Sequence, residues 1–522
     1  MHDRWPTFQP PDRFDDAPVR SGHVSMIKPP KLQALCLAAL AALASCTPAS
    51  REALPPDRSL PQTTTLKETL LPEGLAVGDV TGQSAVLWLR TDGPKAVQVL
   101  WAPLDDWQKM GAMASVRPVV WQTPILITRP ETDFTLSVPL EQLDPATRYR
   151  YRVLVDSVEQ ASAPMRGSLA ATGEVTTLPD PAQSVPLSFA WSGDLGGQER
   201  CRQGEAGYPI FDVIAAQHPD FFVFLGDTVY ADGICSAPPN EPGAGFVATN
   251  LPEYRLRHRY QRGASALRRL LSRVPVYVIW DDHEVKDNFA GPYEPRMAAG
   301  RQALREYWPI ATQSGDPDRL YRSVRYGANL ELFILDTRQY RSRNSEPDGP
   351  AKTMLGAAQL AWLLDGLRAS TATWKAVVTS DPLSIPKGGG GASPGYDGWA
   401  GGLANGSDGT GFERERQVIV DRILADRIKN VVFLAGDVHY VQANAYDPDG
   451  DGRVDFHEFV AGPLSARFGR MTPPNPGLHP TVLLNDGGYA NFGLVRVTAE
   501  AFEVAFVDDT GKTRFSHRVQ AH

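Results

Sequence analysis

The strongest constraint on the fold of this 522-residue chain is a repeated pattern in which an apolar run ends in an acidic residue. Phe221 to Leu225 carries no polar residue, which is typical of a strand buried on both faces of a parallel sheet covered by helices. Gly226 allows a tight turn, and Asp227 follows at the carboxyl end of the predicted strand, where open α/β sheets bind ligands. Five further apolar runs end in the same way, at Asp194, Asp281, Asp336, Asp381 and Asp437.

Carboxylates that converge from several strand ends repel one another unless a cation lies among them. The sequence supplies no basic cluster of matching size beside these positions. Carboxylate oxygens are ligands that hard metal ions prefer. We therefore expect metal ions at this edge of the predicted sheet.

Two kinds of pattern follow one another along the chain. Residues 72–178 hold short runs rich in β-branched and aromatic residues between turn residues, which predicts a small all-β sandwich domain. The segment Leu143 to Tyr149 resembles the corner of fibronectin type III sandwiches, an immunoglobulin-like fold in which a tyrosine hydroxyl bonds back to the backbone. Over residues 187–522 predicted strands alternate with helices, which indicates a layered α/β (α+β) domain.

Helical periodicity places five helices in the second domain, at 208–218, 253–272, 297–307, 356–367 and 413–428. The segment 386–411 is different, because Gly, Ser and Asp dominate it. A loop of this length in a compact domain is usually functional or disordered.

The N-terminal region has the pattern of an export signal and no pattern typical of a folded domain. Lys28 and Lys31 precede the apolar stretch 32–43, which is too short to span a bilayer but suits the core of a signal peptide. The end of this stretch resembles a bacterial lipobox, which makes Cys46 the predicted lipidated residue; an ordinary cleaved signal is the alternative. We thus predict an upstream extension with a lipoprotein-type signal peptide at 1–46 and a flexible tether at 47–71, in an exported protein of the cell envelope or periplasm.

Cysteine use and net charge narrow the possible partners. Outside the signal segment only Cys201 and Cys235 remain, and an exported protein can join them in a disulfide; two free thiols or metal ligation are the alternatives. The formal net charge of −8 provides no basic field, so nucleic-acid binding is not indicated. Anionic substrates stay possible, because bound metal ions invert the local potential. No sequence feature specifies an oligomeric state.

Four sequence blocks, taken in order, carry a family resemblance. The blocks 227–232, 280–284, 335–341 and 436–439 resemble the signatures of PhoD-like alkaline phosphatases, within the calcineurin-like metallophosphatase superfamily. The resemblance runs from about residue 72 to the C-terminus and includes the N-terminal β-domain typical of the family. It implies a metallophosphatase core of β-sandwich sheets flanked by helices.

The resemblance also implies cofactors, namely one Fe³⁺ with Ca²⁺ alongside, with other divalent metals as alternatives. Asp227 would bridge two metals, since one carboxylate can offer an oxygen to each. Tyr230 would present a phenolate, which requires a strong Lewis acid such as Fe³⁺; as an alternative it is a packing residue. Asp194 stands where better-known members carry a cysteine, so thiolate ligation is not carried over. The remaining predicted metal ligands are Asp437 and His439, with Asn288 or Asp282 serving the second metal.

The reaction that the resemblance implies is hydrolysis of phosphate monoesters, with diesters as a second class, by in-line attack of metal-bound hydroxide. His283 is the predicted donor of a proton to the leaving oxygen, and Asp282 beside it is a further catalytic candidate. Arg338 would hold a phosphate oxygen, or would instead form a buried ion pair with Asp336. Expected substrates are small phosphate esters or phospholipid head groups. The alternatives are a phosphodiesterase of phospholipase D type and a non-catalytic calcium-binding surface lipoprotein.

A second acidic motif lies near the C-terminus. The segment from Asp447 to Glu458 fits the loop formula of EF-hands. The flanking segments are predicted strands rather than helices, so a calcium-sensing EF-hand is not expected. Two interpretations stay open: a polar hairpin turn, or a structural Ca²⁺ site with Asp447, Asp449, Asp451 and Glu458 as ligands.

Overall fold

The computed structural model of the chain describes residues 50–53, 66–112, 119–160, 167–388, 395–402 and 409–522. The predicted signal peptide, Cys46 and most of the predicted tether lie outside these residues. Within the described part of the chain, no helix has the length and apolar character needed to cross a membrane.

A nine-stranded mixed sheet carries the first three strand-end aspartates. At its centre the strands β10 (Leu187–Ser192), β11 (Phe221–Leu225) and β12 (Val276–Ile279) run parallel. Parallel strands share one carboxyl edge, so the residues that follow them come together. The outer strands, in order, are β22 (Thr513–Gln520), β21 (Ala501–Asp508) and β20 (Asn491–Val497) beside β10, and β2 (Leu75–Gly78), β3 (Ala85–Arg90) and β7 (Thr135–Leu140) beyond β12.

A seven-stranded sheet carries the other three strand-end aspartates. The strands β14 (Leu330–Ile334), β15 (Trp374–Val378) and β16 (Val431–Ala435) run parallel to one another, and the strand next to β16 on its other side is parallel to them as well. The remaining strands are β13 (Arg322–Tyr326) at one edge, and β18 (Phe456–Val460), β17 (Val441–Tyr446) and β19 (Pro480–Asp486) on the other side of β16.

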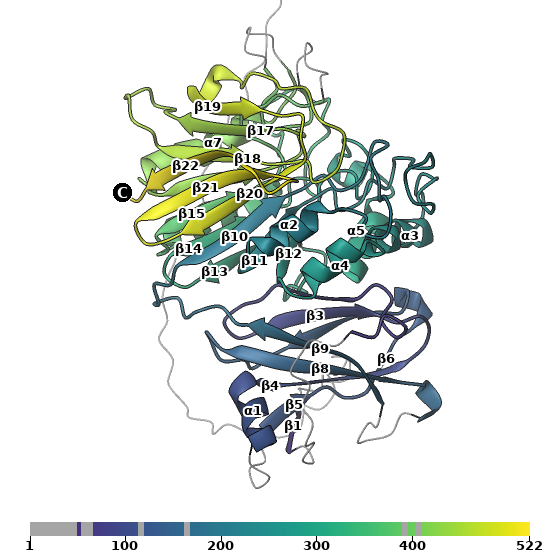
Figure 1. Ribbon diagram of the computed structural model, residues 1–522. Helices are drawn as coiled ribbons and strands as arrows, with labels where there is room; N and C mark the ends of the chain where they lie inside the picture. Colours follow the sequence, from purple (N-terminus) through teal and green to yellow (C-terminus); the bar gives the residue numbers. More distant parts are fainter. Residues whose placement is uncertain (1–49, 54–65, 113–118, 161–166, 389–394, 403–408) are drawn as a thin grey trace, which may run out of the picture. The chain divides into compact units, whose positions relative to one another are not determined.

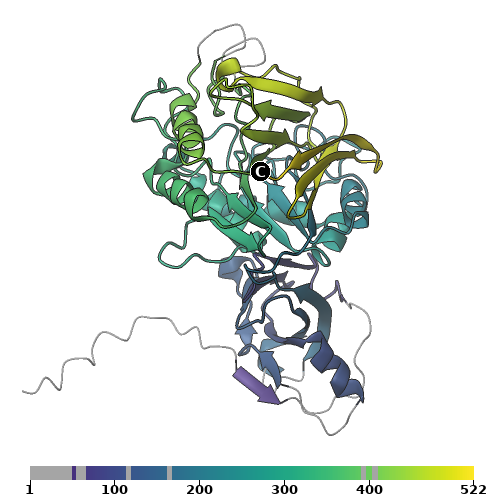
Figure 2. The ribbon, with the colours of Figure 1, turned by 90° about the vertical axis from the view of Figure 1, so that its left-hand side faces the viewer.

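The two sheets pack face to face, and helices cover their outer faces (Figures 1 and 2). Alternation along β16 shows the layers: Phe433 packs in the cluster with helix residues, whereas Val432 and Leu434 belong to the core shared with the other sheet. Trp191 crosses between the sheets, where its indole Nε1 donates to the Ala435 carbonyl at 3.2 Å. The helices are α2 (Ile210–Ala216), α3 (Leu251–Arg262), α4 (Ser265–Leu271) and α5 (Met297–Tyr307) by the first sheet, and α6 (Gly356–Ala369) and α7 (Glu413–Ala425) by the second.

The region predicted as a separate β-sandwich divides its strands between two sheets. One sheet contains β1 (Ser50–Ala53), β5 (Val119–Gln122), β4 (Ala96–Pro103), β8 (Arg148–Asp156) and β9 (Ser168–Thr176), with β6 (Leu126–Ile127) on β4. The strands β2, β3 and β7 instead extend the nine-stranded sheet, because Gly78 pairs with Val276 of β12. The predicted tyrosine corner is present: the Tyr149 hydroxyl accepts the Asp144 backbone N–H at 2.9 Å. Helix α1 (Leu104–Ala112) and four 3₁₀ turns (Pro130–Thr132, Val158–Gln160, Gly291–Tyr293 and Pro476–Leu478) complete the described elements.

The helix predictions agree with the structure except at one position. The stretch 253–272 forms two helices rather than one, because Gly263 ends α3 and Ala264 takes an extended conformation before α4. The predicted helix 297–307 coincides with α5, and the other three differ from α2, α6 and α7 only at their ends.

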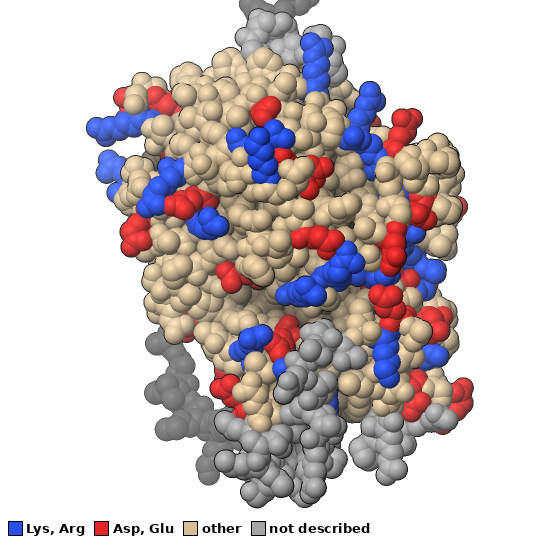
Figure 3. All heavy atoms as spheres, in the orientation of Figure 1, with Lys and Arg blue, Asp and Glu red and all other residues tan. Residues whose placement is uncertain are grey.

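The charges on the face in Figure 3 are mixed in sign. Lysine and arginine side chains alternate there with acidic ones, and no broad patch of a single sign forms on that face.

Candidate metal centre

Five predicted ligands lie in turns with a left-handed backbone. Asp194, Asp227, Asn288, Asp437 and His439 have φ of 63°, 50°, 54°, 73° and 61°. Positive φ is uncommon outside glycine, although Asn, Asp and His tolerate it best. Such conformations persist where the surrounding structure holds them, and they cluster at functional sites. The turns place short polar side chains at the carboxyl edges of both sheets.

One group of candidate ligands joins the two sheets. Asp194 and Asp227 come from the nine-stranded sheet and His439 from the seven-stranded sheet, and one ligand atom from each lies within 4.8 Å of the others. His439 Nε2 is 3.5 Å from Asp194 Oδ1. The Tyr230 hydroxyl lies 2.9 Å from the same His439 nitrogen. Four residues predicted as ligands therefore meet at one point.

Asp227 also belongs to a second group, with Asp282 and His283, and a third group consists of Asp281, Asp282 and Asp437. In each group the ligand atoms lie within 4.8 Å of one another. Because Asp227 is shared by the first two groups, its carboxylate lies between two possible metal positions. Asp281 was not among the predicted ligands, although it follows β12 directly.

Asn288 lies at the edge of these groups. Its backbone N–H donates to Asp282 Oδ2 at 2.6 Å, and its side-chain amide donates to Asp287 Oδ2 at 2.9 Å. Of the two candidates for the second metal, Asp282 thus belongs to the compact carboxylate groups and Asn288 borders them.

Several buried carboxylate oxygens at this edge make no hydrogen bond. They are Asp194 Oδ2, Asp281 Oδ2, Asp282 Oδ1 and Asp437 Oδ2. The Lys387 ammonium contacts Asp437 Oδ2, whereas the other three oxygens meet no lysine or arginine among the described residues. Burying a charge without a partner is costly, so such oxygens fit a bound cation. An array of carboxylates with an imidazole and a phenol suits hard di- or trivalent ions. The residues therefore fit metal ions.

The pKa shifts point the same way. Burial is the largest cause that raises the pKa of Asp227 well above its ordinary value; His283 lowers it, and the carboxylates of Asp282 and Asp281 raise it further. Burial and then the neighbouring carboxylates likewise raise the pKa of Tyr230. A cation among these groups would stabilise their ionised forms and reverse the shifts.

Asp232 holds His283, the predicted proton donor. The Asp232 carboxylate lies 2.7 Å from His283 Nδ1, and the imidazole ring stacks on Tyr230 with 4.1 Å between centroids. His283 Nε2 is left facing the metal groups, 4.0 Å from Asp282 Oδ1. Burial lowers the pKa of His283, but Asp282, Asp227 and Asp232 together raise it well above its usual value. The ring can therefore carry a proton toward the site, with Asp232 as an orienting residue that sequence reasoning missed.

Glu284 is a second missed residue, and it fixes the turns. Its buried carboxylate accepts the backbone N–H groups of Asp227 at 3.1 Å, Thr228 at 2.7 Å and Asp281 at 3.0 Å. Burial raises its pKa to about 7, although these bonds oppose the shift. Its place in the 280–284 block was the only sequence signal, because no pattern shows which distant N–H groups a carboxylate will meet.

The structure corrects both interpretations of Arg338. Its side chain is fully buried, so it does not reach a substrate, and its guanidinium does not pair with Asp336. Instead it contacts Asp281 at 2.6 Å, Asp397 at 2.9 Å and Asp381 at 3.3 Å. Asp336 accepts the Trp280 indole N–H at 2.8 Å, so this strand end takes no part in the metal groups.

Arg341 and Lys387 complete an ionic cluster around Asp381 and Asp397. Arg341 binds Asp381 at 2.7 Å and Asp397 at 3.0 Å. The Lys387 ammonium contacts Asp381, Asp397 and also Asp437 Oδ2, a contact that does not meet hydrogen-bond geometry. Burial lowers the pKa of Lys387, but these carboxylates raise it well above its ordinary value. The lysine is thus charged.

The structure corrects the ligand set of the possible structural calcium site. Strands β17 and β18 flank the loop as expected, but Glu458 lies inside β18, fully buried, where it accepts the Leu383 N–H at 2.6 Å and the Tyr446 hydroxyl at 2.6 Å. The acidic group within 4.8 Å consists of Asp447, Asp449 and Asp455. Asp451 instead accepts the Arg453 backbone N–H at 2.9 Å.

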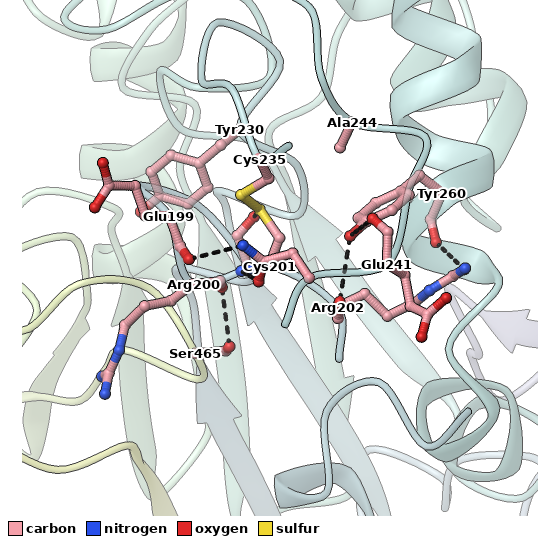
Figure 4. The surroundings of a disulfide bond; sticks show 12 residues. Glu199, Arg200, Cys201, Arg202, Tyr230, Cys235, Glu241, Ala244, Tyr260 and Ser465 are labelled. Carbon is pink, nitrogen blue, oxygen red and sulfur yellow. Dashed lines mark hydrogen bonds between the residues drawn. A yellow bond between two sulfur atoms is a disulfide. The ribbon is translucent and has the colours of Figure 1, made fainter. Parts of the chain in front are cut away.

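A disulfide joins Cys201 and Cys235 beside the centre (Figure 4). It links the loop after β10, which carries Asp194, to the loop after β11, which carries Tyr230. The segments are also held by hydrogen bonds from the Cys201 N–H to Asn240 at 3.1 Å and from the Cys235 N–H to the Ala244 carbonyl at 2.8 Å.

Comparisons with known proteins agree with this arrangement. A family model of the PhoD-like phosphatase matches residues 190–499, and one of the N-terminal domain of PhoD-like phosphatases matches residues 58–179. Alkaline phosphatase D of Bacillus subtilis is 31% identical over 440 residues, which cover 76% of this chain and 68% of the relative.

Two solved structures share the fold. The structure of PhoD has a TM-score of 0.67 and 24% identity, and the match covers 88% of this chain and 94% of that one. Purple acid phosphatase PPD1 from yellow lupin seeds has a TM-score of 0.59 and 12% identity, over 86% and 75% of the two chains. On the strength of the family models and the Bacillus relative, the chain belongs to the PhoD-like phosphatase family and is a phosphoesterase hydrolase.

Proposed function

We propose that this chain hydrolyses phosphate monoesters at a centre of two metal ions. The observation that carries the proposal is the set of ligand groups where the two sheets meet. Within the described part of the chain, these groups hold three buried carboxylate oxygens with neither a hydrogen bond nor a lysine or arginine contact, on Asp194, Asp281 and Asp282. Family membership gives the reaction class, and the array of carboxylates supports this edge of the sheets as the proposed place of the reaction. The array also favours an enzyme over a non-catalytic calcium-binding lipoprotein.

The proposed metals are Fe³⁺ and Ca²⁺. Fe³⁺ would be held by Asp194, Asp227, Tyr230 and His439, because a phenol whose pKa is raised needs a strong Lewis acid to ionise. Ca²⁺ would be held by oxygens of Asp227, Asp281, Asp282 and Asp437, since it prefers oxygen ligands. When bound, such ions activate water and neutralise phosphoryl oxygens.

His283 would protonate the leaving oxygen from Nε2. Asp232 accepts from Nδ1, which leaves Nε2 as the nitrogen that faces the carboxylate groups. Stacking on Tyr230 holds the plane of the ring, so the proton is delivered from a defined direction.

Metal analysis and turnover test this proposal together. We expect about one iron per chain, a visible tyrosinate-to-iron band, and hydrolysis of p-nitrophenyl phosphate that chelation abolishes. Tyr230→Phe should lose the band. Full activity in a chelated protein, or active protein without bound iron or calcium, would reject the centre.

A cavity beside Asn288 favours phosphodiesters, including phospholipid head groups, as a second substrate class. The cavity measures ≈ 500 Å³, and Arg343 and Tyr396 lie in its wall. Arg343 is exposed and stacks over Tyr293 at 3.9 Å, so its guanidinium can meet a second anionic or polar group. Comparing p-nitrophenyl phosphate with its bis-ester separates the two activities: hydrolysis of the monoester alone would reject the diester proposal.

We also propose export with a lipid anchor at Cys46. The disulfide between Cys201 and Cys235 supports export, because disulfides persist in oxidising compartments. Fatty-acid labelling of cells that express the chain tests the anchor. Label on the native chain but not on Cys46→Ser is expected, and an unlabelled native chain would contradict it.

A further inference from the structure

Lys387 is a lysine whose ammonium is surrounded by carboxylates. Its Nζ lies 3.3 Å from Asp381 Oδ1 and 3.1 Å from Asp397 Oδ2, and it contacts Asp437 Oδ2. The lysine side chain is 11% exposed, and those of Asp381, Asp397 and Asp437 are 0%, 0% and 6% exposed. Oxygens that converge from three side chains on one buried point are the arrangement that surrounds a bound Ca²⁺ ion.

The backbone fixes the position of this ammonium. The Lys387 carbonyl accepts the N–H groups of Tyr396 at 2.8 Å and Asp397 at 3.3 Å. These two bonds hold the backbone of the lysine beside that of Asp397, one of its carboxylate partners. The ammonium therefore has a defined position in the folded protein and differs from a lysine side chain that moves freely at the surface.

Neighbouring guanidiniums do not neutralise the cluster. Arg338 and Arg341 are two cations, whereas Asp281, Asp381, Asp397 and Asp437 are four carboxylates, so two negative charges are left. The ammonium offsets one of them. A divalent ion in the same position would offset both.

We propose that Lys387 fills a cation position next to the metal centre, where it replaces a further divalent ion and limits how many metal ions this chain binds. The proposal extends the proposed function, because Asp437 belongs both to this cluster and to the metal groups. Lys387 is a positioning residue: its ammonium contacts Oδ2 of Asp437, a carboxylate that also belongs to the metal groups.

The test counts calcium in native protein and in Lys387→Met, each dialysed against the same Ca²⁺ buffer and analysed by plasma mass spectrometry. Lys387→Met should bind about one Ca²⁺ per chain more than native, because the freed carboxylates form an oxygen site. Calcium should also raise its Tm by more than it raises the native Tm. Lys387→Arg, which keeps the charge, should retain the native count.

Lys352→Met is the matched control. Lys352 is also buried, but its ammonium contacts backbone carbonyls of Asn344, Glu346 and Thr410 rather than carboxylates. This variant should bind no additional calcium. A gain in Lys352→Met equal to that in Lys387→Met would overturn the proposal.

Two further results would overturn it. One is a native calcium count in Lys387→Met, or failure of that variant to fold even with calcium present. The other is retention of the additional calcium when Asp397→Asn is combined with Lys387→Met. A native chain without any metal would instead contradict the proposed function, so the two failures are distinguishable.

Discussion

Strand-end aspartates meet two different fates in this molecule. Asp194 and Asp227 have histidine and tyrosine neighbours, and among the described residues no lysine or arginine forms an ion pair with either. Asp381, together with Asp397 from the glycine-rich segment, lies against Arg338 and two further cations in a buried ionic cluster. The residue type is the same in both regions. Asp281 and Asp437 stand between the two regions, because each belongs to a ligand group and also contacts a basic side chain, Arg338 or Lys387.

The two regions should therefore respond differently to metal. The ionic cluster carries its own cations and needs no added ion for most of its charge. The metal groups keep unpaired oxygens, so bound ions should stabilise them. Substitutions on each side can break or sharpen this contrast.

The largest effect is expected for Asp227→Ala, which removes the carboxylate shared by two ligand groups. Metal content should fall, and kcat/KM should drop by at least ~10³-fold, the upper range for losing one preorganised electrostatic group. Metal analysis beside a p-nitrophenyl phosphate assay checks both. Native metal content with native activity would place the centre elsewhere.

Arg338→Met probes the ionic cluster, where it leaves buried carboxylates without their partner. The free energy of unfolding should fall by about 3–5 kcal/mol, as is typical when one member of a buried ion pair is removed. Urea unfolding measures this, with the exposed Arg368→Met as control, expected to stay within about 0.5 kcal/mol of native. Similar losses of stability in both variants would show that the buried ion pairs of Arg338 contribute no more than an exposed arginine.

His283→Ala separates catalysis from metal binding. The variant should keep its iron, yet turn over poor leaving groups on the order of 10²-fold more slowly, because these need a proton donor. p-Nitrophenolate leaves readily without a proton, so its loss should be smaller. Equal loss for alkyl and nitrophenyl esters would argue against a proton-donor role.

Asp232→Asn tests how His283 is oriented and charged. Activity should fall about 10-fold, as for residues that orient a functional group. A general acid works only while protonated, so kcat/KM falls as pH rises through its pKa. Asp232 raises the pKa of His283, so the variant's alkaline limb should move to lower pH. An unchanged pH profile would show that Asp232 has only a structural part.

The smallest effect is expected in chelated protein. Asp194→Asn should raise the free energy of unfolding by ~1 kcal/mol, because one unpaired buried carboxylate is neutralised. Asp397→Asn should lower it, since Asp397 binds both arginines. Urea midpoints in chelator measure both, and changes of the same sign would remove the distinction between the regions.

Local pattern was enough to place most elements. The predicted helix 297–307 matches α5 residue for residue, and Tyr149 makes the predicted corner bond to Asp144. These features depend on periodicity and on neighbours a few residues apart. The division of 253–272 at Gly263 was missed, because both halves have the same basic, helical composition.

Partners far apart in the sequence escaped prediction. Arg338 was expected near phosphate or Asp336, but it meets Asp397, which lies in the long glycine-rich segment. Glu458 fitted the EF-hand loop formula, yet it lies buried in β18, where its carboxylate accepts the Tyr446 hydroxyl. In both cases the residue lies in a recognisable sequence motif. Its partner, however, comes from a distant part of the chain, and the spacing within the motif does not indicate which one.

The sequence alone determines that buried strands are followed by carboxylates. The apolar residues of each run cause the strand to be buried, and the polar residues after it form the turn. The sequence also determines the family, through four blocks that occur in the family's order along the chain. Tertiary packing decides which strand-end carboxylates receive Arg338, Arg341 or Lys387 and which, like Asp194 and Asp227, receive no basic side chain among the described residues. The reason is that charge pairing acts over a few ångströms, and only the folded chain brings residues dozens of positions apart within that distance.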